Sequence, residues 1–155
     1  MLDIKRTFNY SDIHQENESS RLNSIKVLMK KGEGPCISIF MPGRCSIGSC
    51  QDIKNTYLNL ILKSEEWLSG GFLQTHEISD LLALAHKLLY NDVFWEQQSD
   101  GLGLFLARKQ FLCFRVPVVF QELVVISKAF EVSPLMPALQ ANNYILYSGF
   151  KLVCC

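Results

Sequence analysis

Apolar residues recur at helical spacing in two long segments of the chain, 51–68 and 75–90. In the second segment they follow one another at i, i+3, i+4, i+7, i+10 and i+11, which is typical of one buried helix face. These positions are Ile78, Leu81, Leu82, Ala85, Leu88 and Leu89. Gly70 and Gly71 are expected to stop the first helix, and Thr75 to cap the second. The pattern predicts two amphipathic helices joined by a short turn.

From Gly101 onward the period changes from helical to strand-like. Short β-rich segments bounded by turn residues predict strands. They are expected at 36–41, 102–107, 111–116, 122–127 and 144–150. The turn Arg108-Lys109-Gln110 joins two of these segments and predicts a β-hairpin. A short helix is expected to open at Ser133-Pro134 and to reach about Gln140.

The N-terminal region carries weaker patterns. Residues 4–10 are a candidate strand, and the polar residues 11–20 are interpreted as a loop or linker. Leu22, Ile25, Leu28 and Met29 repeat at helical spacing and predict a helix over 20–31. With helices gathered in the first half and strands in the second, the sequence favours an α+β fold. We expect a mostly antiparallel or mixed sheet of about four to six strands, with the two long helices packed on one face.

Composition places the chain among folded domains. It has 155 residues, of which 48% are apolar and 19% charged, so one ordinary core can form. Lys plus Arg and Asp plus Glu are both 15, which gives a formal net charge of zero and argues against a general nucleic-acid binder. The N-terminus lacks the order of a secretory signal, and no apolar run reaches the roughly 18 residues of a membrane span. We therefore expect a cytoplasmic location and no membrane partner.

The six cysteines do not suggest a metal centre. Cys36 and Cys113 lie in apolar, strand-like runs and are expected to pack as small core residues. Cys45 and Cys50 flank a Gly/Ser loop, but no second close pair of Cys or His ligands accompanies them. No metal and no cofactor is predicted.

Several segments together resemble one family. They are 35–42, 59–68, the most specific piece 94–107, 116–117, 130–139 and 144–146, in that order along the chain. The resemblance is to the N-terminal domain of the bacterial relatives of archaeo-eukaryotic peptide-chain release factors and Pelota-type ribosome-rescue factors. On this basis residues 1–20 are an N-terminal extension, 21–150 the release-factor-like domain, and 151–155 the start of a following domain that is missing here.

The resemblance implies a ribosome or RNA partner but supplies no catalytic residue. In release factors the peptide-release chemistry belongs to a Gly-Gly-Gln loop of the central domain. Here Phe72 follows Gly70-Gly71, so we interpret these glycines as a helix stop. The helix motif of the family usually has a Lys before its Asn, and Leu58 stands at that place. This departure removes a candidate polar contact.

Candidate nucleic-acid contacts are Arg108 and Lys109 at the hairpin turn, Arg115 near it, and Trp95. Guanidinium and ammonium groups bind phosphates, and an indole ring can stack on bases. The alternative interpretation is that the basic residues are solvated turn charges and that Trp95 anchors the helices to the sheet. A second basic cluster, Lys26, Lys30 and Lys31, lies on the predicted helix 20–31 and has the same two interpretations.

No constellation points to catalysis. The acidic pairs Glu65-Glu66 and Glu96 with Asp100 are expected on polar faces, where paired carboxylates do little acid–base work. We expect a non-catalytic recognition domain. The alternative is a stand-alone protein-interaction or dimerisation module without a translation role. Residues 144–153 read as a strand with an uncovered apolar edge, which predicts a homodimer through the C-terminal strand.

Overall fold

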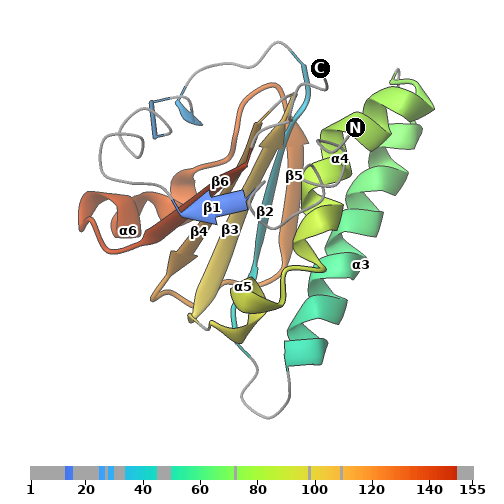
Figure 1. The fold of residues 1–155 in the computed structure, drawn as a ribbon. Coiled ribbons are helices and arrows are strands. Elements are labelled where there is room, and N and C mark those ends of the chain that lie inside the picture. Colours follow the sequence, from blue (N-terminus) through green and yellow to red (C-terminus); the bar gives the residue numbers. More distant parts are fainter. Residues whose placement is uncertain are drawn as a thin grey trace.

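The computed structural model describes residues 13–15, 25–26, 28–29, 34–44, 50–71, 73–97, 99–108 and 110–149. These residues form one six-stranded sheet with helices beside it (Figure 1). The strands are β1 (Ile13–Gln15), β2 (Cys36–Pro42), β3 (Gly101–Ala107), β4 (Gln110–Val116), β5 (Leu123–Ser127) and β6 (Ile145–Gly149). The helices are α3 (Cys50–Ser69), α4 (Thr75–Leu88), α5 (Asp92–Glu96), the 3₁₀ turn η2 (Ser133–Leu135) and α6 (Met136–Gln140). The predicted α+β fold is confirmed.

The strands lie in the order β1-β6-β4-β3-β2-β5, and every neighbouring pair is antiparallel. The β3–β4 hairpin stands at the centre, with Ala107 opposite Gln110 next to the turn and Gly101 opposite Val116 at the other end. The sequence predicts both this hairpin and the separate strand β5, because each combines a β-rich run with clear turn residues.

Helices α3 and α4 cover one face of the sheet. Helix α3 packs over β2 and β5, and α4 packs over β3. Leu82 of α4 and Leu104 of β3 are both buried in the core between the layers. The Tyr57 hydroxyl of α3 donates a 2.7 Å hydrogen bond to the carbonyl of Ala85, which ties the two helices together. The predicted helices 51–68 and 75–90 are confirmed to within two residues at each end.

The N-terminus of α4 differs in detail from the prediction. Gln74 is the N-cap, and Thr75 is the first helical residue. The Glu77 carboxylate accepts a 2.9 Å hydrogen bond from the Gln74 backbone N–H. A carboxylate at this position satisfies an N–H that the helix itself leaves free, so Thr75 is not needed as a cap.

The opposite face of the sheet is also buried. Phe40, Phe105 and Phe114 point to this side and form a second core with Leu135 of η2 and Ala138 of α6. Because consecutive residues of β3 and β4 are apolar, both faces of these strands need cover. The prediction of helices on one face is thus incomplete, and the segment after β4 covers the other face.

The N-terminal prediction needs a correction. Residues 11–20 are expected to form a loop, but Ile13–Gln15 is a strand paired with Tyr147–Gly149 of β6. An edge strand of this length is held by its backbone groups, so its side chains need show no alternation. Strand β1 thereby occupies the edge of β6 that the predicted homodimer requires to be free.

Other predictions fall outside the described residues. These are the candidate strand 4–10, residues 150–155, and all of the predicted helix 20–31 except 25–26 and 28–29. Of that helix, Leu28 is buried against the second core.

Candidate functional site

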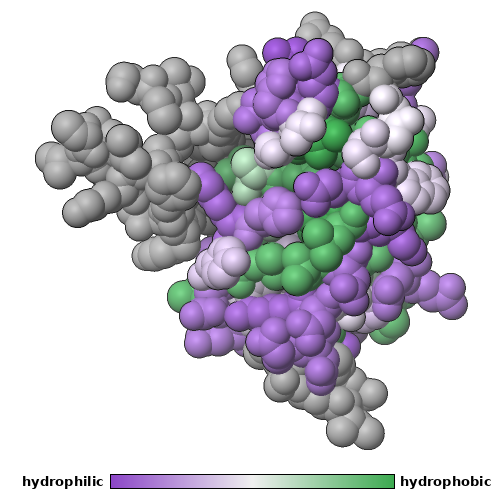
Figure 2. Space-filling model, turned by 90° about the vertical axis from the view of Figure 1, so that its right-hand side faces the viewer, coloured by the Kyte–Doolittle hydropathy of each residue, from purple (hydrophilic) through white to green (hydrophobic). Residues whose placement is uncertain are grey.

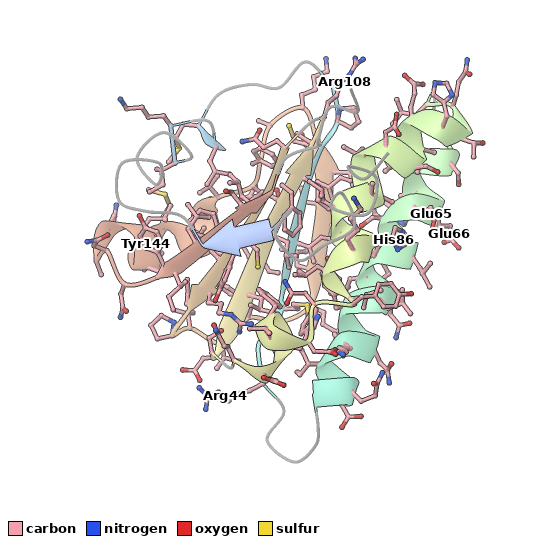
Figure 3. The ribbon with its side chains drawn as sticks, in the orientation of Figure 1. Arg44, Glu65, Glu66, His86, Arg108 and Tyr144 are labelled. Carbon is pink, nitrogen blue, oxygen red and sulfur yellow. The ribbon has the colours of Figure 1, made fainter. Side chains whose placement is uncertain are left out.

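The turn of the central hairpin presents one basic side chain to solvent. Arg108 is exposed and directly follows Ala107, where the buried part of β3 ends. Figure 3 shows Arg108 at one end of the sheet and Arg44 at the opposite end. Because β3 and β4 are almost entirely buried, the turn is carried by a firmly packed scaffold. Lys109, the other predicted contact in the turn, lies outside the described residues.

Arg115 is not part of that basic surface. The strand register places it opposite Leu102, towards the end of the hairpin that is far from the turn. Its side chain is 3% exposed, its guanidinium carbon lies 4.1 Å from the Phe94 ring centroid, and its Nη2 donates to the Phe94 carbonyl. The prediction of a phosphate contact at Arg115 is therefore wrong, because the guanidinium is enclosed by aromatic rings.

Trp95 is also buried, with 4% of its surface exposed. Its indole Nε1 donates a 2.7 Å hydrogen bond to the carbonyl of Leu88, and its ring packs against Tyr57 at a centroid distance of 5.2 Å. No face of the indole is left for a base. The alternative interpretation is confirmed: Trp95 and Phe94 anchor α5 between α4 and the sheet.

Asp100 and Gly101 form a closely packed turn at the start of β3, at the end of the sheet opposite Arg108. The Asp100 carbonyl accepts a 2.9 Å hydrogen bond from the N–H of Gly43, and its carboxylate lies 3.2 Å from Nε of Arg44. A Cβ atom on Gly101 would lie 2.0 Å from the Val118 carbonyl oxygen, so this position requires glycine. The backbone groups of this turn are engaged within the protein, which favours a structural role.

A hollow of about 280 Å³ lies where α3 begins and α4 ends. It holds an ion pair between Lys54 and Asp92, with 3.1 Å between Nζ and Oδ1. Leu58 and Leu89 line it, and Tyr90, which also lines it, is 84% exposed. On this helical side of the molecule, apolar surface interrupts the polar surface (Figure 2). The sequence does not reveal the hollow, because its residues come from two helices and a turn that only the fold brings together.

Neither predicted acidic pair is enclosed, because Glu65 and Asp100 are only partly buried and their partners are exposed. Glu65 and Glu66 lie along α3, away from the sheet (Figure 3). Glu66, Glu96 and His76 are exposed. Within the described part of the chain, no three His, Cys, Asp or Glu side chains lie together as metal ligands would.

The two cysteines with described side chains, Cys36 and Cys113, are buried and form no disulfide. Burial raises the pKa of the Cys113 thiol to about 12, against the opposing influence of the nearby Arg115 charge. Burial also raises the pKa of the Tyr57 hydroxyl. A thiol with so high a pKa stays protonated near neutral pH and is a poor nucleophile. Both cysteines behave as the core residues that the sequence predicts.

The glycine pair at 70–71 ends α3, as predicted. The N–H of Gly70 bonds to the Trp67 carbonyl and that of Gly71 to the Leu68 carbonyl, which closes the last helical turn. None of the described helices is long and apolar enough to cross a membrane. In comparisons with known proteins, no family model and no curated protein matches the sequence.

Proposed function

We propose that the protein is a non-catalytic recognition domain that contacts ribosomal RNA through the turn of its β3–β4 hairpin. The observation that carries this proposal is the exposed Arg108 at the tip of two otherwise buried strands. Because the hairpin backbone is already ordered, pairing with a phosphate costs mainly the rotamer freedom of the Arg108 side chain. Lys109, its neighbour in the sequence, adds a second positive charge. The resemblance of residues 35–150 to the N-terminal domain of release-factor relatives favours a translation partner.

Because Arg115 and Trp95 are buried, the proposed contact with RNA consists of phosphate contacts and includes no base stacking by Trp95. Because the Trp95 indole and the Arg115 guanidinium lie in the core, neither can join Arg108 in a contact with RNA. Binding would then depend on salt more than on sequence. Each phosphate of single-stranded RNA that the protein neutralises makes the slope of log affinity against log salt concentration about 0.7 more negative.

Ribosome co-sedimentation tests the proposal. The wild-type chain is expected to pellet with ribosomes at low salt, and Arg108→Glu, alone or with Lys109→Glu, to remain in the supernatant. The matched control is Lys63→Glu, which makes the same change of charge at an exposed position on α3. Equal pelleting of Arg108→Glu and Lys63→Glu would place any ribosome contact elsewhere, and no pelleting of the wild-type chain would refute the proposal.

A second candidate is a stand-alone protein-interaction module that uses the hollow between α3 and α4. It is favoured by the apolar side chains that stay exposed on the helical side, since Tyr90 is 84%, Val93 57% and Leu62 47% exposed. Exposed apolar side chains gathered near a hollow, with an aromatic residue such as Tyr90 at its lining, are typical of contact surfaces. Concentration-dependent self-association that Tyr90→Ala weakens, in a wild-type chain that does not pellet with ribosomes, would favour this candidate.

A further inference from the structure

One edge of the sheet ends in a strand whose outer side pairs with no other described strand. Strand β5 (Leu123–Ser127) is the last strand in the sheet order and pairs only with β2 among the described strands. Its five residues, Leu-Val-Val-Ile-Ser, include no charge and no proline. Charged side chains and prolines are the usual means by which proteins protect an edge strand from pairing with another chain. Among the described residues nothing pairs with the outer edge of β5, so this edge is a template for a further strand.

The residues that flank β5 make this edge self-complementary. Glu122 precedes the strand, Lys128 follows it, and both are exposed. In an antiparallel pairing of two copies centred on Val125, that residue lies opposite its own copy. Val124 then lies opposite Ile126, and Leu123 opposite Ser127. In the same register Glu122 of each copy lies opposite Lys128 of the other.

We propose that two copies of this chain form a homodimer by antiparallel pairing of their β5 strands, in the register centred on Val125. The pairing joins the two six-stranded sheets into one continuous sheet. Two cross-strand pairs of opposite charge, one at each end, fix the register. The zero net charge of the chain means that little long-range repulsion opposes the approach of the copies.

The helix beside this edge offers a further apolar group. Helix α3 packs over β2 and β5, and its flank with Lys54 and Leu58 faces the hollow shared with α4. At about 100° per residue, Trp67 lies on the opposite flank of α3, towards the β5 side. Its side chain is 60% exposed. In the proposed dimer the two α3 helices flank the junction of the sheets, so this tryptophan lies close to the second copy.

A second copy fits this edge better than an unrelated peptide, because its own Lys128 and Glu122 carry the charges that match Glu122 and Lys128. An unrelated strand would need a Lys opposite Glu122 and a Glu or Asp opposite Lys128, at the same separation. The chain supplies that arrangement itself through the twofold symmetry. An isologous interface of this kind closes at two copies and does not propagate.

Sedimentation velocity of the full chain over a range of concentrations, under reducing conditions, tests the proposal. The wild-type chain is expected to pass from monomer to dimer as its concentration rises. Glu122→Lys alone, or Lys128→Glu alone, places like charges opposite each other at both ends and is expected to raise the dimer Kd at least about tenfold. The double variant Glu122→Lys/Lys128→Glu exchanges the partners and is expected to restore the wild-type Kd.

The control is Glu96→Lys, the same change of charge at an exposed position of α5, and it is expected to leave the Kd unchanged. Thermal unfolding of every variant shows whether each is folded. A wild-type chain that stays monomeric at the highest concentration overturns the proposal. So does a dimer that the two single reversals leave unchanged, or that the double variant fails to restore. None of these variants alters Arg108, so the outcome is independent of the ribosome experiment.

Discussion

The guanidinium carbon of Arg115 lies 4.1 Å from the centroid of the Phe94 ring, and its Nη2 donates a hydrogen bond to the carbonyl of the same residue. The Tyr147 ring centroid lies 5.7 Å away. Among the described residues, no carboxylate pairs with this buried cation, and its Nε has no hydrogen-bond partner. Aromatic ring faces and one carbonyl thus compensate only part of the cost of removing the charge from water.

This arrangement predicts different costs for two replacements of Arg115. Arg115→Ala removes the packing and the hydrogen bond and is expected to lower the free energy of unfolding by about 2–4 kcal/mol. Arg115→Met keeps most of the apolar volume and removes the poorly compensated charge, so its cost should be less than half as large. Urea unfolding of both variants measures the difference. Equal losses would show that the charge itself stabilises the fold.

The packing of the helices on the sheet predicts that truncating a buried leucine on either side of the contact lowers stability. Leu82 and Leu104 are 1% and 0% exposed on opposite sides of this contact. Each change to Ala is expected to cost about 2–5 kcal/mol of unfolding free energy. The matched control is Leu62→Ala on the outer side of α3, where a loss within about 0.5 kcal/mol is expected. Losses below about 1 kcal/mol at both buried leucines would contradict the packing of these layers.

The elements that the sequence predicts best are those with a repeated side-chain pattern. Helix α4 shows six apolar positions at helical spacing, and the central hairpin joins two β-rich runs through a polar turn. Strand β1 is not predicted, because it has no repeated side-chain pattern. It is three residues long and is held by backbone pairing to β6, so no side-chain pattern marks it.

The candidate site is harder to predict than the fold. The sequence places Arg115 on the surface because a charged residue in a strand usually lies on a solvated face. Strand β4, however, is covered on both faces, and Arg115 points into the core on the helical side. The sequence contains the two rings that receive it, Phe94 and Tyr147, but they are 53 positions apart, 147 minus 94, and only the fold brings them together.

Two glycines provide a matched test of close backbone packing. A Cβ atom at Gly101 would lie 2.0 Å from the Val118 carbonyl oxygen, whereas one at Gly34 would meet nothing within 4 Å. Gly101→Ala must therefore displace the segment after β4 and is expected to cost about 1–3 kcal/mol or more. Gly34→Ala is expected to change stability by less than about 1 kcal/mol. The added methyl group meets nothing in the folded chain, so its main effect is to lower the conformational entropy of the unfolded chain. Chemical denaturation of the two variants decides this, and a tolerated Gly101→Ala would contradict the close approach.

The protonated thiol of Cys113 predicts how stability changes in alkaline solution. Burial raises its pKa from 9.0 to about 12 in the folded chain. A raised pKa means that the folded state binds the proton more tightly than the unfolded state. The resulting stability is complete below about pH 9 and is lost progressively as the pH rises towards the folded pKa. Tyr57, whose pKa is raised in the same direction, adds a similar loss at higher pH.

Cys113→Ala separates the thiol from the other titrating groups. The variant is expected to be less stable than the wild-type chain at neutral pH, because it leaves a small cavity in the core. That difference should be constant below about pH 8 and should shrink by roughly 1 kcal/mol per pH unit above about pH 9. Denaturant unfolding in the presence of a reducing agent, carried out on both chains at a series of pH values, measures it. The contrary result is that the wild-type chain and Cys113→Ala lose stability in parallel up to about pH 10.5. In that case the thiol would ionise equally in the folded and unfolded states, and Cys113 would not be a buried, protonated thiol.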